Sequence, residues 1–116
     1  QTIFADISTK AFGVVEGQEL LGYAIGRLET QNWISTGHVL SIAVRKNWHG
    51  KGLGKVLLQN LLEYFSTSKT ASCWLEVRST NDEAIQFYKR HGFVQQNEVR
   101  GYYTNGDSAL FMKKYL

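Results

Sequence analysis

Three glycines lie where a short apolar run gives way to a helical pattern. They are Gly50, Gly52 and Gly54. Residues 39–44 before them are rich in strand-forming side chains, and after them apolar residues recur at the i, i+3, i+4 spacing of a helix that starts near residue 52. The first amides of a helix lack internal acceptors and carry partial positive charge. Because glycine lets an anion approach the backbone closely, and Lys51 and Lys55 add charge, this entrance is predicted to bind phosphate.

The spacing of these glycines excludes the two commonest phosphate-binding motifs. A Walker P-loop, G-x-x-x-x-G-K-[ST], needs glycine where His49 stands and serine or threonine where Val56 stands. The dinucleotide fingerprint G-x-G-x-x-G fails as well, because Lys55 or Leu57 occupies its third glycine position. The anion is therefore held by another kind of glycine turn.

A carboxylate stands in the middle of the apolar run 71–78, which is predicted to be a strand. Alternation places its residues on two faces, one with Ser72, Trp74, Glu76 and Arg78 and the other with Cys73, Leu75 and Val77. Glu76 is either a general base beside a cleft or a charge on a solvated sheet face. Cys73 points away from it, so we expect a packing role for the thiol rather than an acyl-enzyme.

A short helix is predicted over residues 81–91. Thr80 with Glu83 has the spacing of a capping box, and Gly92 is placed to close the helix. Tyr88 shares a face with Ala84 and Ile85, where a tyrosine usually packs in the core while its hydroxyl reaches a partner.

The remaining elements give the order β-β-β-α-β-α-β-β, which is that of an α/β domain with a mixed sheet. Strands are expected over 11–16, 19–29, 39–44, 71–78, 93–103 and 107–115, with a polar loop over 30–37 and an Asn-Gly hairpin turn at 105–106. The long helix is expected to bury a stripe formed by Leu53, Val56, Leu57, Leu61, Tyr64 and Phe65. Residues 1–10 are expected to be a loop or the end of a helix.

Composition fits one globular domain with a core of its own, since 43% of the 116 residues are hydrophobic and 13% are aromatic. The net charge of +3 suits a polyanionic small molecule, a nucleic acid or an ordinary solvated surface. One cysteine and the lack of a long apolar run favour a soluble cytoplasmic protein without a membrane partner. His38, His49 and His91 lack the spacing of metal ligands, so no metal is expected and surface or packing roles are assigned to them.

Two segments resemble the GCN5-related N-acetyltransferase (GNAT) superfamily. Residues 49–54, His-Gly-Lys-Gly-Leu-Gly, are similar to its coenzyme A loop [QR]-x-x-G-x-[GA], with His49 in the Gln/Arg place. Residues 74–93, WLEVRSTNDEAIQFYKRHGF, look like the RimI-type pattern WLEVRxSNxxAxxLYxxxGF, with Thr80 and Phe87 as the departures. The similarity extends over roughly residues 39–115.

The resemblance implies a mostly antiparallel sheet whose two central strands splay apart, flanked by helices, with acetyl-CoA in the opening. Backbone groups of Ile42, Ala43 and Val44 would hold the pantetheine and the acetyl carbonyl. Asn81 would be a further coenzyme contact. The pyrophosphate would rest on the loop formed by His49, Gly50, Lys51, Gly52, Leu53, Gly54 and Lys55.

The resemblance also assigns chemistry. Glu76 corresponds to the general base and Tyr88, with an ordinary pKa near 10, to the acid that protonates the leaving thiolate. Tyr102 and Tyr103 match tyrosines that flank the acceptor, although aromatic packing in a hairpin explains them equally well. The implied reaction is direct transfer of acetyl to a protein N-terminus, such as a ribosomal protein alanine, whose α-amine has a pKa of about 7.7–8.0 against about 10.4 for lysine.

Three alternatives stay open: the same chemistry on a small amine or lysine, a non-catalytic acyl-CoA-binding module, and a nucleic-acid-binding domain. The last is disfavoured because the aromatic residues follow core spacing rather than a basic stripe. We expect one N-acetyltransferase domain over residues 1–116, a monomer or weak dimer, that lacks the strand and two helices with which family members usually begin. Those elements form one wall of the acceptor site, so the acceptor is the least determined feature.

Overall fold

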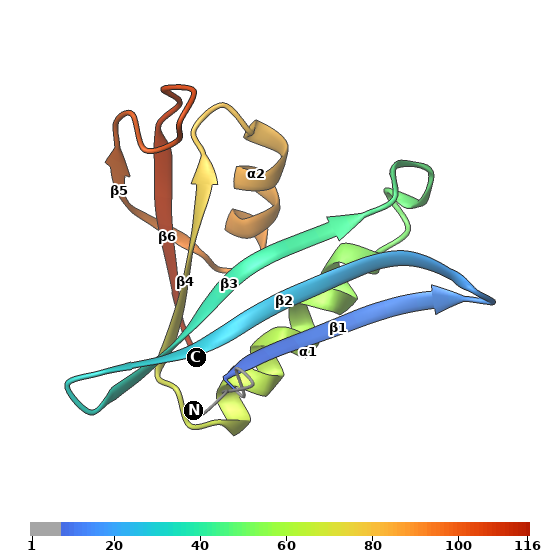
Figure 1. Cartoon of the computed structure of the whole chain (residues 1–116), viewed down its shortest axis with the longest axis horizontal. Helices are drawn as coiled ribbons and strands as arrows, with labels where there is room; N and C mark the ends of the chain where they lie inside the picture. The colour runs from blue at the N-terminus through green and yellow to red at the C-terminus, as the bar shows by residue number, and fades with distance from the viewer. Residues whose placement is uncertain (1–7) are drawn as a thin grey trace, which may run out of the picture.

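The computed structural model describes residues 8–116 as one mixed sheet with two α-helices (Figure 1). Along the chain these are β1 (Thr9–Glu16), β2 (Glu19–Gln31), β3 (Ile34–Val44), the 3-10 turn η1 (Lys46–Trp48), α1 (Leu53–Thr67), β4 (Ser72–Arg78), α2 (Asp82–Arg90), β5 (Val94–Val99) and β6 (Ala109–Tyr115). The predicted α/β class and element order are confirmed. The loop or helix end expected over residues 1–10 falls outside the described residues as far as residue 7. In the described part, β1 begins at Thr9.

The sheet has the strand order β1-β2-β3-β4-β6-β5 and is antiparallel except between its central strands. β3 and β4 are parallel and pair at only three positions, Thr36 with Ser72, Gly37 with Cys73 and His38 with Trp74. Beyond His38 the two strands diverge, as Figure 1 shows. The register between β2 and β3 also skips Leu40, and such a bulge bends the strand that carries it. The splayed centre predicted for the sheet is thus present, and it leaves the end of β3 unpaired on one side.

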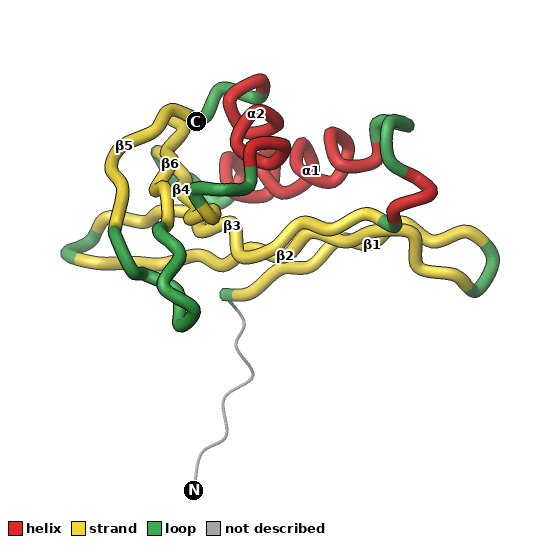
Figure 2. Tube along the Cα trace, turned by 90° about the horizontal axis from the view of Figure 1, so that it is seen from above, coloured by secondary structure: helices red, strands yellow, loops and turns green. Residues whose placement is uncertain are grey.

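Both helices lie on the same face of the sheet (Figure 2). α1 packs on the first three strands through Leu57, Leu58, Leu61 and Phe65, all nearly inaccessible to solvent. Gly37 makes this approach possible, because a Cβ there would stand 2.5 Å from the ring of Phe65. The predicted stripe is correct at Leu57, Leu61 and Phe65 but wrong at Val56, which is 47% exposed, and it missed Leu58.

The predicted alternation along β4 is confirmed. Cys73, Leu75 and Val77 belong to the buried core beneath the helices. The alternate residues Trp74, Glu76 and Arg78 are half-buried and point to the opposite face of the sheet. The face without helices therefore carries the carboxylate.

The loop predicted over 30–37 is wrong. β2 continues to Gln31 and β3 begins at Ile34, so a two-residue turn at Asn32 and Trp33 joins them. Both turn residues have positive φ, which is the geometry of a tight hairpin turn but an uncommon one for tryptophan. The segment is polar because it is the exposed end of a hairpin, and not because it is a loop.

Two further boundaries differ from the prediction. β5 ends at Val99, so Tyr102 and Tyr103 lie in the connection 100–108 and not at the end of a strand. At α2, the capping oxygen comes from Asn81, which accepts a hydrogen bond from the Ala84 amide at 3.2 Å, and not from Thr80. Among residues 8–116, no helix is long and apolar enough to cross a membrane.

Candidate active site

A cavity of about 650 Å³ lies on the helix side of the sheet, where β3 and β4 diverge. Such a volume is typical of small-molecule and cofactor sites. Eleven predicted binding or catalytic residues line it: Ile42, Ala43, Val44, His49, Gly50, Gly52, Leu53, Gly54, Lys55, Asn81 and Tyr88. Six more that sequence reasoning missed complete the wall: Trp48, Glu83, Ala84, Phe87, Arg90 and His91.

The entrance of α1 forms one wall of this cavity. Its N-cap is Gly52, with φ of 81°, no side chain caps the first turn, and that turn holds no acidic residue. Gly50 also has positive φ, and nothing lies within 4 Å of a Cβ added at either glycine. The first intrahelical bond runs from the Val56 amide to the Gly52 carbonyl, which leaves the three preceding amides without a helical acceptor. This wall offers backbone donors, partial positive charge and the ammonium of Lys55.

His49 fastens this entrance to the end of β3. Its Nε2 lies 2.7 Å from the carbonyl oxygen of Val44, and because a carbonyl only accepts, Nε2–H is the donor. The histidine that departs from the family pattern thus has a local structural role. Lys51, also predicted to bind the coenzyme, is not part of the cavity wall, and its ammonium lies 5.8 Å from the ring centre of Trp48.

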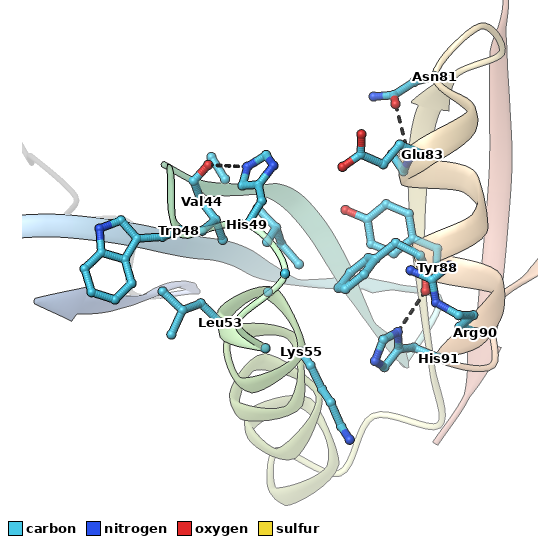
Figure 3. A pocket seen from close by; sticks show the side chains of 17 residues that line it. Val44, Trp48, His49, Leu53, Lys55, Asn81, Glu83, Tyr88, Arg90 and His91 are labelled. Atoms are coloured by element: carbon cyan, nitrogen blue, oxygen red, sulfur yellow. Dashed lines mark hydrogen bonds between the residues drawn. The ribbon is translucent and has the colours of Figure 1, made fainter. Parts of the chain in front are cut away.

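The facing wall comes from α2, from which Glu83 and Tyr88 project toward the cavity (Figure 3). Tyr88 packs edge-on against Phe87 and Phe93, with ring centroids 5.3 and 5.6 Å away. Burial raises the pKa of Tyr88 to about 12. The expectation of an ordinary pKa near 10 is therefore wrong, because the aromatic surroundings disfavour the phenolate. Tyr88 keeps its proton throughout the neutral range.

On the other face of β4, Glu76 ends a chain of charged and polar side chains. Its Oε2 lies 2.8 Å from Nε2 of His38, and Nδ1 of His38 lies 3.0 Å from Oε2 of Glu29. That oxygen also accepts hydrogen bonds from Arg27, from Nη2 at 2.8 Å and Nε at 3.1 Å. The imidazole is buried and stacks on Trp74 at 3.7 Å between ring centroids. The histidine therefore connects the predicted base to a second, arginine-paired carboxylate.

The two carboxylates decide the charge of His38. Burial alone would lower the pKa of the imidazole, but hydrogen bonds to Glu76 and Glu29 and their charges outweigh it and raise the pKa above 6.5. For Glu29, burial favours a higher pKa, yet the hydrogen bonds from Arg27 and His38 bring the pKa below 4.5. Near neutral pH the network thus favours an imidazolium between two carboxylates.

Tyr102 and Tyr103 lie on this same side, in the connection between β5 and β6, which Figure 2 shows on the side of the sheet away from the helices. Tyr102 contacts Tyr103 and Phe111 edge to face, with centroids 5.1 and 5.4 Å away. Burial raises the pKa of Tyr103, the charge of Glu76 raises it further, and the cation of Arg78 offsets part of this. The structure thus gathers both tyrosines and the glutamate on one face and the coenzyme-type residues on the other.

Sequence reasoning missed His38 as a site residue and assigned it to packing or the surface. The residue lies inside β3, between the predicted loop over 30–37 and the strand predicted from position 39. Its partner Glu76 is 38 residues away, and only the parallel register of His38 with Trp74 brings the two together. Within the hairpin, the β2–β3 register pairs Glu29 with Thr36 and Arg27 with His38, so a two-residue turn predicted at Asn32 and Trp33 would have placed Glu29 and His38 on one face, but not Glu76.

Comparison with known proteins agrees with this architecture. The profile described as the acetyltransferase (GNAT) family matches residues 2–93. The chain is 35% identical over 112 residues to an N-alpha-acetyltransferase of Sulfurisphaera tokodaii, covering 88% of this chain and 67% of that protein. It is 35% identical over 96 residues to an uncharacterized N-acetyltransferase of Methanocaldococcus jannaschii, covering 82% of this chain and only 59% of the relative.

Comparison with a solved structure supports the same fold. The ribosomal-protein-S18-alanine N-acetyltransferase from Escherichia coli superposes with a TM-score of 0.81 at 28% identity, over 94% of this chain and 70% of that one. The family profile spans most of the sequence, and the splayed sheet and glycine turn expected from the resemblance are present in the described residues. This chain belongs to the acetyltransferase (GNAT) family.

Proposed function

We propose that the protein is an acetyl-CoA-dependent N-acetyltransferase that acts on the α-amine of a protein N-terminus, by direct attack of the amine on the thioester. The observation that carries this proposal is the gap between β3 and β4. An anion-binding helix entrance opens on one side of it, and a carboxylate with two tyrosines lies on the other. Such a sheet separates a donor side from an acceptor side and connects them through the gap.

The donor side fits acetyl-CoA, which supplies an activated acetyl group when bound. The uncapped amides of α1 and the ammonium of Lys55 suit its phosphates. Within residues 8–116, the edge of β3 facing the gap has no strand partner after His38, so the backbone groups of residues 42–44 that point away from β2, apart from the Val44 carbonyl bonded to His49, can bind an amide-rich arm. Amides placed there also suit an oxygen that becomes negatively charged during acyl transfer.

Glu76 would remove the proton from the attacking amine, directly or through water. An α-amine, with a pKa of about 7.7–8.0, is partly deprotonated near neutrality, so proton removal by this base is less demanding than from lysine at about 10.4. His38 holds Oε2 of the carboxylate and fixes its orientation. Support for an N-terminal acceptor comes from similar proteins, one named an N-alpha-acetyltransferase and one from E. coli named for a ribosomal protein alanine.

Tyr88 lines the donor cavity in its protonated form and would face the departing sulfur. A thiol has an ordinary pKa of about 8.5, well below the value of about 12 for this tyrosine. Complete proton transfer to the thiolate would therefore be uphill. We expect Tyr88 to act mainly by donating a hydrogen bond to sulfur as negative charge develops there.

The test is an acceptor panel with acetyl-CoA. Peptides with free N-termini beginning with Ala, Ser or Met, the same peptides with blocked N-termini and one internal lysine, and small primary amines would be compared by kcat/KM. The proposal expects the free N-termini to be preferred, with mass spectrometry placing the acetyl group on the α-amine. Preference for the lysine peptide or a small amine would overturn the acceptor assignment. Coenzyme binding without turnover of any acceptor would indicate a non-catalytic acyl-CoA-binding module.

A further inference from the structure

Arg78 is the last residue of β4 and lies two positions after Glu76 on the same face of the sheet. The proposed mechanism gives it no role, and it is not part of the donor cavity wall. Its guanidinium nevertheless contacts three residues of the connection 100–108. Nη1 donates to Asp107 Oδ2 at 2.9 Å and to Asn105 Oδ1 at 3.1 Å, and Cζ lies 4.0 Å from the ring centre of Tyr103.

The contacted residues form a closed turn. Asn105 and Asp107 bond to each other twice, from Nδ2 to Oδ2 at 3.0 Å and from the Asp107 amide to Oδ1 at 3.1 Å. The Tyr103 amide donates to the Asp107 carbonyl, and the Gly106 amide donates back to the Tyr103 carbonyl. The turn is thus rigid within itself, and Arg78 is the side chain that fastens it to β4.

From this turn an aromatic series leads back to the carboxylate. The ring of Tyr103 contacts that of Tyr102, and Tyr102 contacts Phe111. Phe111 stacks on Trp74 at 5.8 Å between centroids. Trp74 in turn stacks on His38, which holds Glu76. The turn and the predicted base therefore belong to one continuous wall on the face without helices.

Stability does not explain these contacts. The side chains of Arg78 and Asp107 are 43% and 35% exposed, and ion pairs at such exposure add little to folding free energy. What the planar guanidinium does provide is geometry, because Nη1 bonds Asp107 and Asn105 while the flat group lies over the ring of Tyr103. A stacked and doubly bonded arginine at the edge of an acceptor site is suited to positioning.

We infer that Arg78 is a positioning residue for the acceptor, holding Tyr103 and its turn beside Glu76 so that the entering N-terminus lies between them. The inference rests on the proposed function and extends it to a residue that touches neither the coenzyme pocket nor the reacting atoms. Its loss should weaken acceptor binding and leave the donor side unchanged.

The experiment compares Arg78→Met and Arg78→Lys with wild type, using the best peptide of the acceptor panel. We expect Arg78→Met to raise the peptide KM about tenfold while kcat at saturating peptide and the affinity for coenzyme A stay within about twofold. Arg78→Lys keeps the charge but not the planar fork, so it should recover only a minor part of the loss.

Arg100→Met is the matched control, since Arg100 is exposed and begins the same connection. It should leave the peptide KM near the wild-type value. If Arg78→Met and Arg100→Met raise the peptide KM equally, only the positive charge matters, and the inference is overturned. In a double variant, Arg78→Met should add little to Tyr103→Leu, because both disturb one contact.

The two possible failures are distinguishable. A wild-type protein that acetylates no acceptor would remove the proposed function and this inference together. An active wild type whose Arg78→Met variant keeps its peptide KM, with coenzyme binding intact by calorimetry, would overturn the inference alone.

Discussion

The two faces of the sheet present different groups to a ligand. On the helix side, the cavity presents backbone: the uncapped amides of α1, glycines with positive φ and the unpaired edge of β3. On the other side, the surface around Glu76 consists of side chains, with three carboxylates, a histidine, two arginines and a series of packed rings. Backbone binding depends on conformation, whereas side-chain binding depends on residue identity.

The difference explains which substitutions each face tolerates. The donor side accepts His49 in place of the family's Gln or Arg, because that side chain bonds the Val44 carbonyl and leaves the amides free. On the acceptor side each member of the network has a specific partner, so one change removes a contact that nothing else replaces. If this is right, variants on the two faces should affect different kinetic constants.

The largest effect should come from Glu76→Gln. Loss of a general base typically lowers the rate by about 10²–10⁴-fold, and we expect at least the lower value in kcat. The affinity for coenzyme A should not change, because Glu76 is absent from the cavity wall. Steady-state kinetics and calorimetry measure the two quantities. Glu98→Gln, an exposed carboxylate on β5, is the control, and a variant that retained full kcat would show that Glu76 is not the base.

Gly52→Asp should weaken coenzyme binding on the donor side, because it changes both the conformation and the charge of the α1 entrance. A carboxylate at the N-cap of α1 would occupy the amides offered to phosphate and repel it, so coenzyme affinity should fall about 30- to 100-fold, or roughly 2–3 kcal/mol. Gly17→Asp makes the same change at another positive-φ glycine with open space around it, in the β1–β2 turn. Both variants should lose similar stability, and equal coenzyme affinities measured by calorimetry would contradict an anion site at α1.

A third variant, His38→Gln, tests the acceptor network through its pH dependence. The folded state raises the pKa of His38 above 6.5, so its stabilisation is complete below 6.5 and is lost as pH rises through the folded pKa. Glu29 behaves in the opposite sense, since its lowered pKa gives stability above 4.5 that is lost on acidification.

The difference in unfolding free energy between wild type and His38→Gln should therefore be greatest between about pH 4.5 and 6.5, at about 1–2 kcal/mol, and shrink on either side. Denaturant titrations across this range measure it, and kcat at neutral pH should fall about tenfold if the histidine orients Glu76. A double-mutant cycle with Glu29→Gln should show coupling that fades above the folded pKa. A difference independent of pH would exclude the charged pair.

Most of the donor side could be predicted from sequence because its determinants are local. The glycine turn, the helix that follows it and residues 42–44 all lie within one short segment, and the structure brings them together around one cavity. The predicted buried stripe of α1 differs from the observed one at Val56 and Leu58, because the buried face is rotated slightly about the helix axis. Local pattern was enough there.

The acceptor side could be predicted only in part because its contacts are non-local. Alternation placed Glu76 on its face of β4 and the family resemblance assigned it the role of base, but the bond from His38 depends on a parallel register that no local pattern encodes. The polar residues at 30–37 led to the prediction of a loop where the structure has the ends of two strands. Arg78 has no predictable role from sequence, because its partners lie in the connection 100–108. Long-range pairing of side chains, not secondary structure, limited the prediction.

The smallest effect should come from Asn81→Ala, which separates capping from coenzyme contact. α2 differs from α1 in having its entrance closed, by Asn81 Oδ1 on the Ala84 amide and by Asp82 and Glu83 in the first turn. Removing the cap should cost about 1 kcal/mol of folding free energy by denaturant titration. Because Asn81 also lines the cavity, coenzyme affinity should fall, but less than about threefold if capping is its main role. Asn81→Ser, which keeps a capping oxygen, should restore stability. A tenfold loss of affinity in both variants would instead make Asn81 a direct coenzyme ligand, in addition to the Lys55 ammonium and the backbone amides of α1.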